Sequence, residues 1–271
     1  MPPLPTGDPG GEARLASGLI AKMPRRIRIH LAYDGGGFHG WQVQPGLATI
    51  QGTLEAVAAE IEGKPVHVAG SGRTDAGVHA LRQVAAFTLE NPIPTANLTR
   101  ALNRLLPPAI RVLSAEDTRE DFHPRFDARA KTYEYRIFRG EVCDPFEWRF
   151  VHHYPYPLDE PRMAEYARHF EGEHDFSAFA AADERDAEGH SKVRTIYSSI
   201  LEGAPHRLVY RVRGSGFLKH MVRNLVGTLI EAGKGNLPEP AGFPEHCGPT
   251  APAKGLFLVS VEYDAASDPR P

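Results

Sequence analysis

The first half of the chain carries two hydrophobic periods in succession, which predict six elements in the order β-α-β-β-α-β. Apolar residues recur at every second position where a strand is indicated, and at every third or fourth position where a helix is indicated. Gly63 ends the first helical pattern and Pro107 stops the second, as helix-terminating residues do. The predicted strands are 27–33, 66–69, 83–89 and 110–114, and the predicted helices are 49–63 and 95–106.

The second half repeats this order, although its residues do not match those of the first half. Asp159 is a predicted helix cap, and Gly172 ends the helix that follows it. The predicted strands are 131–138, 193–201, 207–213 and 256–263, and the predicted helices are 159–172 and 216–232. The pattern predicts an α+β protein with two ferredoxin-like halves, 25–128 and 129–264, whose antiparallel sheets form a central cleft. Such a cleft is the default place for a ligand.

The composition is that of a globular protein with loose ends. Of the 271 residues 41% are apolar and 24% are charged, which is enough for a well-developed core. We expect residues 1–24 to form a disordered leader and residues 265–271 a loose tail. Cys143 and Cys247 lie far apart and outside any CxxC pair, which fits a reducing cytoplasm. No apolar run is long enough to span a bilayer, so no membrane partner is expected.

The distribution of charge is more informative than the net charge of −3. Segment 204–236 has six basic residues and one acidic residue, a net charge of +5, whereas 171–190 has seven acidic residues and one arginine, a net charge of −6. A phosphate backbone would be attracted to the first segment, where Arg211 and Arg213 are candidate contacts, and repelled by the second. Each segment is equally well explained as a solvated face.

One aspartate, Asp75, lies in a glycine-rich stretch, GSGRTDAGVHA at 70–80, between two apolar strand-like runs. In an extended segment Arg73 and Asp75 would lie on the same side of the chain, because side chains alternate with period two. Glycine also lets a substrate approach the main chain. An aspartate among glycine and threonine is commonly a turn-former, so local sequence leaves both a reactive carboxylate and a plain turn open.

The usual cofactor and metal signatures are missing from the sequence. It contains no P-loop, no GxGxxG before a helix, no HExxH and no GxSxG, so we expect neither a metal site nor a cofactor. The tripeptide Asp75-Ala76-Gly77 is compatible with an aspartic protease turn, which would need a second aspartate. A single carboxylate, aromatic strands and a basic segment fit an enzyme that acts on an extruded RNA base, or a non-catalytic RNA-binding module.

The stretch GRTDAGVHA at 72–80 resembles the signature of the TruA family of tRNA pseudouridine synthases. Further blocks of the same family follow in the family's order, so the resemblance runs from about Arg25 to Tyr263. These blocks are AYDG at 32–35, FHGWQ at 38–42, TIQG at 49–52, FHPRF at 122–126, AKTYEY at 130–135, GEHDF at 172–176, VRTI at 193–196 and FLKHMVRN at 217–224. The acidic stretch 178–190 is longer than the family pattern.

The resemblance implies a cytoplasmic homodimer that isomerises uridine to pseudouridine at positions 38 to 40 of the tRNA anticodon stem-loop, without cofactor or metal. It implies that Asp75 is the nucleophile and that Arg223 pairs with it. Tyr133 would pack against the target base, and Arg73 would help to displace it. Each substrate-binding residue also has a plainer role open: core packing for Tyr133, a phosphate contact for Arg223 and loop support for Arg73.

Overall fold

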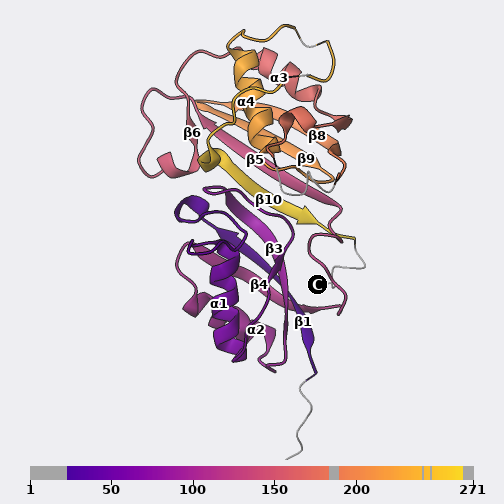
Figure 1. The fold of residues 1–271 in the computed structure, drawn as a ribbon. Helices are drawn as coiled ribbons and strands as arrows, with labels where there is room; N and C mark the ends of the chain where they lie inside the picture. The colour runs from indigo at the N-terminus through magenta and orange to yellow at the C-terminus, as the bar shows by residue number, and fades with distance from the viewer. Residues whose placement is uncertain (1–22, 183–188, 240, 245, 265–271) are drawn as a thin grey trace, which may run out of the picture.

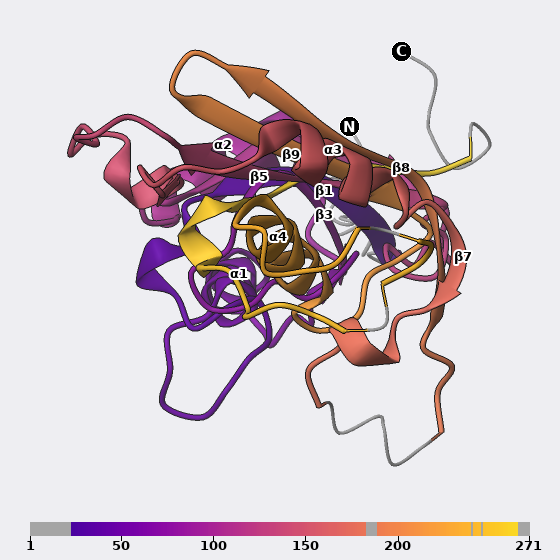
Figure 2. The same ribbon diagram turned by 90° about the horizontal axis from the view of Figure 1, so that it is seen from above.

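The protein folds around one large twisted sheet. In the computed structural model the described residues are 23–182, 189–239, 241–244 and 246–264. Residues 1–22 of the leader expected at 1–24, and the expected tail at 265–271, lie outside them. Ten strands form a single mixed sheet, and helices α1 and α4 lie on the same side of it (Figure 1, Figure 2). This mixed α/β architecture with a central multi-stranded sheet agrees with the predicted class in outline.

The elements of the first half follow the predicted order. They are β1 (Arg25–Tyr33), α1 (Ile50–Glu62), β2 (Ala69–Gly70), β3 (His79–Leu89), α2 (Thr95–Leu105) and β4 (Ile110–Thr118). The Thr49 side chain caps α1 by accepting a hydrogen bond from the Gly52 amide, and Gly63 ends the helix in the left-handed region at φ 79°. Strand β3 begins four residues earlier than predicted, so it starts directly after the loop that carries Asp75.

The second half also follows its predicted order, with additional short strands. Its elements are β5 (Ala130–Phe138), β6 (His152–His153), α3 (Glu160–Arg168), β7 (Gly172–Asp175), β8 (Val193–Ala204), β9 (Arg207–Gly214), α4 (Met221–Gly233) and β10 (Leu256–Glu262). Asp159 caps α3 as predicted. Helix α4 starts five residues later than predicted, because His220 has a left-handed backbone, φ 62°, which a helix cannot contain.

The expected pair of separate sheets is wrong in one respect, because the two halves share a continuous sheet. The strand order is β4-β1-β3-β10-β5-β9-β8-β7, with β2 paired to β3 and β6 paired to β5. The junction is a short parallel pairing of β3 with β10, where Phe257 lies opposite His79 and Leu258 opposite Ala80. This pairing satisfies backbone groups that two separate sheets would each leave unpaired at an edge.

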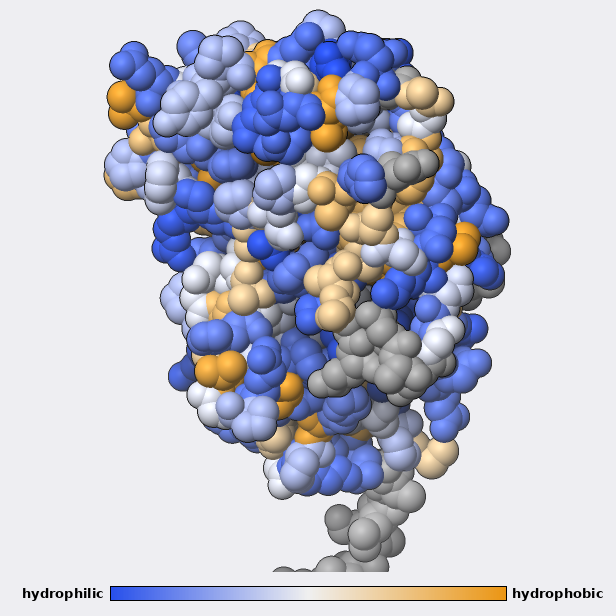
Figure 3. All heavy atoms as spheres, turned by 45° about the horizontal axis from the view of Figure 1, so that its top comes forward, coloured by the Kyte–Doolittle hydropathy of each residue, from blue (hydrophilic) through white to orange (hydrophobic). Residues whose placement is uncertain are grey.

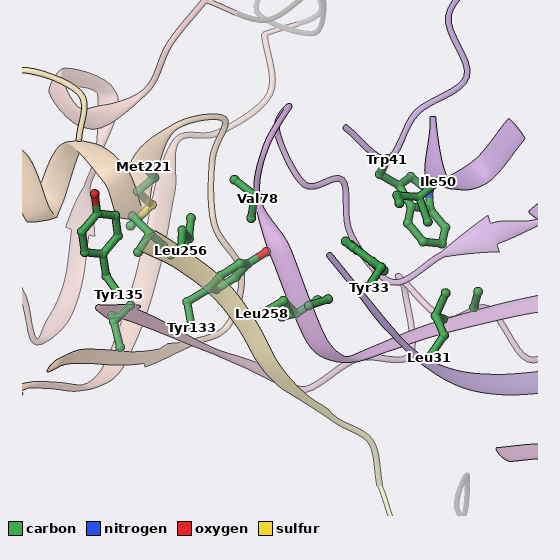
Figure 4. Packing of buried hydrophobic residues seen from close by; sticks show 14 of the residues in the cluster. Leu31, Tyr33, Trp41, Ile50, Val78, Tyr133, Tyr135, Met221, Leu256 and Leu258 are labelled. Atoms are coloured by element: carbon green, nitrogen blue, oxygen red, sulfur yellow. The ribbon is translucent and has the colours of Figure 1, made fainter. Parts of the chain in front are cut away.

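The hydrophobic core is likewise continuous across the junction. One cluster of buried side chains includes residues of both halves. In Figure 4, Tyr133 lies between Tyr135 and Leu256 of the second half on one side and Tyr33 of the first half on the other. The junction is therefore a packed interior region in which side chains from both halves meet.

The outer surface seen in Figure 3 is mostly hydrophilic, and its hydrophobic residues form small separate groups. Within the described ranges, no helix has both the length and the apolar character that crossing a membrane requires.

Candidate active site

The loop between β2 and β3 holds Asp75 at the junction of the two halves. Its last part is a turn that begins at Asp75, since the Val78 amide donates to the Asp75 carbonyl at 3.1 Å. The chain after β1 packs directly against it: the Trp41 amide donates to the Thr74 carbonyl at 3.0 Å. Gly40, at φ 87°, makes this approach possible, because a Cβ there would lie 2.7 Å from the Thr74 oxygen.

Asp75 forms an ion pair with Arg223, which lies near the start of α4. Arg223 Nη1 donates to Asp75 Oδ2 at 3.0 Å, and Arg223 Nε donates to the Ala251 carbonyl at 2.7 Å. His220 Nε2 lies 3.6 Å from the same carboxylate oxygen. No described group donates a hydrogen bond to the second oxygen, Oδ1. The pair therefore holds one oxygen of the carboxylate and leaves the other available for chemistry.

Tyr133 lies beside this ion pair at the middle of β5. Its ring is 7% exposed and meets Phe217 edge-on, with 5.1 Å between ring centroids. Burial raises the pKa of Tyr133 well above its ordinary value, and the neighbouring Tyr33 and Asp75 raise it further. The phenol is therefore protonated at neutral pH and can donate a hydrogen bond. In Figure 4 the hydroxyl points toward the start of β3, near Val78.

Arg73 does not join this group. Its side chain is exposed, and among the described residues it makes no hydrogen bond or ion pair. The ion pair between Arg73 and Asp75 that their spacing allows is not formed, and Asp75 pairs with Arg223 of the other half. The structure thus brings together Asp75, Tyr133 and Arg223, and directs Arg73 toward solvent.

Comparison with known proteins decides which family this constellation belongs to. The family model described as tRNA pseudouridine synthase matches residues 30–127 and 166–264, which include Asp75, Arg73 and Arg223.

The chain belongs to the tRNA pseudouridine synthase family.

Individual relatives agree with the family model. The chain is 75% identical over 239 residues to tRNA pseudouridine synthase A of Solibacter usitatus (strain Ellin6076), covering 88% of this chain and 100% of that protein. It is 42% identical over 255 residues to tRNA pseudouridine synthase A of Limosilactobacillus fermentum, covering 90% and 98%. Among solved structures, a match to the archaeal box H/ACA sRNP Nop10-Cbf5 complex covers 77% of this chain and 43% of that chain. Its sequence identity is 15% and its TM-score is 0.36.

The basic segment of this synthase is less available to phosphate than its charge suggests. Three of its arginines pair with carboxylates: Arg207 with Glu147, Arg211 with Glu134 at 2.7 Å, and Arg213 with Glu262 at 2.6 Å. The hydrogen bond from Arg213 lowers the pKa of Glu262, as a stable ion pair does. Arg211 also lies on the sheet face opposite Tyr210 and Val212, which are buried in the core. The expectation that Arg211 and Arg213 contact RNA is therefore not favoured.

Two other expectations concern a metal site and the acidic stretch 178–190. Nowhere in ranges 23–182, 189–239, 241–244 and 246–264 do three or more His, Cys, Asp or Glu side chains gather as they would to hold a metal ion. All four acidic residues of 178–190 lie at 183–188, outside the described residues.

Sequence reasoning missed two side chains of this region, His220 and Lys131. His220 stands in the FLKHMVRN block, but neither its left-handed backbone nor its distance from Asp75 is visible in the sequence. Lys131 stands two residues before Tyr133 and on the same face of β5, and its ammonium group reaches the Ser71 carbonyl at 2.6 Å. The two-residue spacing of Lys131 and Tyr133 on one strand is the signal in the sequence that could have pointed to Lys131.

Proposed function

We propose that this chain isomerises uridine to pseudouridine in tRNA, with Asp75 as the nucleophile. The observation that carries the proposal is the Asp75–Arg223 pair at the junction of the two halves, within a chain of this family. The hydrogen bond from Arg223 to Oδ2 fixes the position of the carboxylate. The free oxygen, Oδ1, is the attacking atom.

The reaction breaks the bond between uracil N1 and ribose C1′ and forms a bond between C5 and C1′. The uracil must turn before it rejoins the ribose, and the proton on C5 is lost while N1 gains one. Attack on the ribose and attack on the base both require an ionised carboxylate with one open oxygen. Both routes are consistent with the arrangement of Asp75 and Arg223.

Tyr133 and Arg73 are assigned supporting roles. Tyr133 packs against the target base, and its protonated hydroxyl can donate to the base while the base is detached. A base inside a stem must be extruded before it can react, which costs stacking and pairing energy. Arg73 is exposed and makes no bond with another described residue, so it can enter the space that the base leaves.

The finer architecture is proposed to consist of two ferredoxin-like halves, 25–128 and 129–264. Support comes from the strand orders, β4-β1-β3-β2 and β10-β5-β9-β8. The two orders are the same when the short strands β6 and β7 are left out and each half is numbered separately. By the same family resemblance we propose a cytoplasmic homodimer that needs neither cofactor nor metal. Light scattering of the purified protein at working concentration tests the dimer, and a monomer mass would contradict it.

The proposed target is uridine at positions 38 to 40 of the anticodon stem-loop. A carbodiimide-based pseudouridine map of tRNA should show loss of modification at these positions in cells lacking the protein, and its return on complementation. Loss at other positions instead would leave the isomerase in place and contradict the target. Unchanged modification at every position would favour a non-catalytic RNA-binding module.

A further inference from the structure

The direction of the Arg73 side chain depends entirely on the backbone that carries it. The Arg73 side chain is exposed and makes no hydrogen bond or ion pair with another described residue that could orient it. A residue that must enter an RNA stem at a defined point needs a defined starting direction, since small errors of placement cost large factors in rate. The groups that hold residues 71–74 are therefore part of the machinery on which Arg73 depends.

Gln83 of β3 holds residues 71 and 72 by hydrogen bonds from its side chain. Its side chain is fully buried, and its Nε2 donates to the Gly72 carbonyl at 3.0 Å, directly before Arg73. Its Oε1 accepts a hydrogen bond from the Ser71 hydroxyl at 2.5 Å. Nε2 also lies 3.3 Å from the Tyr33 hydroxyl, so both ends of the amide are used. A buried amide whose donors and acceptors are all satisfied is a rigid element.

The residue after Arg73 is held in the same network. The Tyr33 hydroxyl lies 2.9 Å from Thr74 Oγ1. Burial raises the pKa of Tyr33 to about 12, so the phenol keeps its proton, and either hydroxyl of the Tyr33–Thr74 pair can be the donor. The Trp41 amide holds the Thr74 carbonyl as well. Arg73 is thus flanked on both sides by residues with fixed positions.

Lys131 holds the loop from the other half of the molecule. Its Nζ donates to the Ser71 carbonyl at 2.6 Å, and the ammonium group packs over Gly72, where a Cβ would lie 3.2 Å from it. Burial lowers the pKa of Lys131 to about 8, and the charges of Arg125 and Arg194 lower it further. Burying an ammonium group costs free energy unless the group is hydrogen-bonded. Here the Lys131 side chain extends from β5, the strand of Tyr133, to the loop of Asp75, where its ammonium group donates to the Ser71 carbonyl.

We propose that Gln83 and Lys131 are positioning residues that clamp the backbone of residues 71–74 and so direct Arg73 at the RNA. The proposal rests on the proposed function, in which Arg73 displaces the target base. It assigns the clamp no contact with the substrate. Gln83 acts within the first half, whereas Lys131 links the loop to β5 and to Tyr133.

A double-mutant cycle tests the clamp through Arg73. The variants Lys131→Met, Gln83→Leu and Arg73→Ala are compared, alone and in pairs with Arg73→Ala, by single-turnover tritium release from uridine C5 in tRNA at saturating enzyme. We expect each clamp variant to slow the reaction about tenfold when Arg73 is present, and less than twofold when it is alanine. Equal losses in both backgrounds would overturn the positioning role.

Asn103→Ala is the matched control. Asn103 bridges α2 to β4 by two hydrogen bonds with Val112, so its loss removes a comparable structural tie that does not involve residues 71–74. The control should lower the melting temperature and leave the single-turnover rate within twofold. If Gln83→Leu does not fold, Lys131→Met carries the test. An unchanged rate in Arg73→Ala alone would contradict the proposed role of Arg73, whereas uncoupled losses would contradict only the clamp.

Discussion

At the scale of single residues, the Asp75–Arg223 pair joins two positions 148 residues apart and makes the two oxygens of one carboxylate inequivalent. Arg223 and His220 both face Oδ2, while Oδ1 has no hydrogen-bond donor among the described residues. The carbonyl of Ala251 fixes the guanidinium by accepting from its Nε. A lysine at 223 could not make both contacts, because an ammonium group lacks the guanidinium's fork.

Lys131 gives a prediction about stability and pH. Its pKa falls from an ordinary value of 10.5 to about 8 in the folded protein. Between these values the unfolded chain binds a proton that the folded chain does not, so stability rises with pH in this window. The free energy of unfolding of the native protein, relative to Lys131→Met, should be flat below pH 8 and rise by about 1 kcal/mol per pH unit up to pH 10. Parallel curves in denaturant titrations would contradict the shift.

The sequence predicted the candidate residues better than their partners. The glycine-rich stretch singled out Asp75, and family resemblance supplied Arg223 and Tyr133, which the fold brings together. Local spacing allowed an ion pair between Arg73 and Asp75, but the structure pairs Asp75 with Arg223, 148 residues away, and local spacing carries no information about so distant a partner. The burial of Lys131 depends on contacts between β5 and a loop 60 residues earlier, which no local pattern records.

At the scale of elements, helix α4 and the segment that follows it form a unit around Arg223. The Ala251 amide donates to the Arg223 carbonyl at 3.1 Å, and the Gly248 amide donates to the Thr228 hydroxyl at 2.8 Å. Gly227 lets the two backbones meet: a Cβ there would lie 1.7 Å from the Pro249 carbonyl oxygen. The position of the ion pair therefore depends on the absence of a side chain in the helix.

Gly227→Ala should destabilise the protein, although alanine normally favours a helix by about 1 kcal/mol. The clash with Pro249 must displace one backbone, which costs about 2 kcal/mol and moves the Ala251 carbonyl away from Arg223. We expect a lower melting temperature together with a slower single turnover. Gly37→Ala is the control, because a Cβ at Gly37 meets nothing within 4 Å. Equal melting temperatures for the two variants would contradict the prediction, because they would show that the backbone at Pro249 can move away from α4 at no cost in stability.

Element order was predictable, whereas pairing between elements was only partly so. Periodicity and caps such as Thr49 and Asp159 predicted most elements, because these signals are local. The start of α4 was misplaced, since the left-handed backbone of His220 is set by its surroundings. The parallel pairing of β3 with β10 depends on how the halves pack, and a repeated β-α-β-β-α-β pattern does not contain that information.

At the scale of the whole molecule, the two sides of the sheet differ in what they offer to an RNA. Helices α1 and α4 lie on the same side of the sheet (Figure 2), and Arg223 of α4 pairs with Asp75. On the opposite side of the second half, Arg211 pairs with Glu134 and Arg213 with Glu262. Their charges are already neutralised, so the net charge of segment 204–236 overstates its attraction for phosphate.

This difference predicts how the salt dependence of tRNA binding responds to substitution. Arg211→Ala should leave the slope of log K against log salt unchanged, because Glu134 already neutralises Arg211. Lys219 lies between β9 and α4, directly before His220, and its ammonium group donates a hydrogen bond to the Ala182 carbonyl and to no carboxylate among the described residues. Lys219→Ala should reduce the slope by about 0.8, the value for one lost phosphate contact. Filter binding across a salt series measures both, and a reduced slope for Arg211→Ala would place RNA on the side of the sheet that carries Arg211.

The central claim is that the Asp75 carboxylate is the nucleophile, and Asp75→Asn tests it most directly. The amide keeps the size of the side chain but is a poor nucleophile, so the variant should fold and bind tRNA within a few-fold of the native protein. We expect pseudouridine formation in tRNA to be abolished in a single-turnover assay. Conversion by Asp75→Asn at the native rate would contradict the assignment.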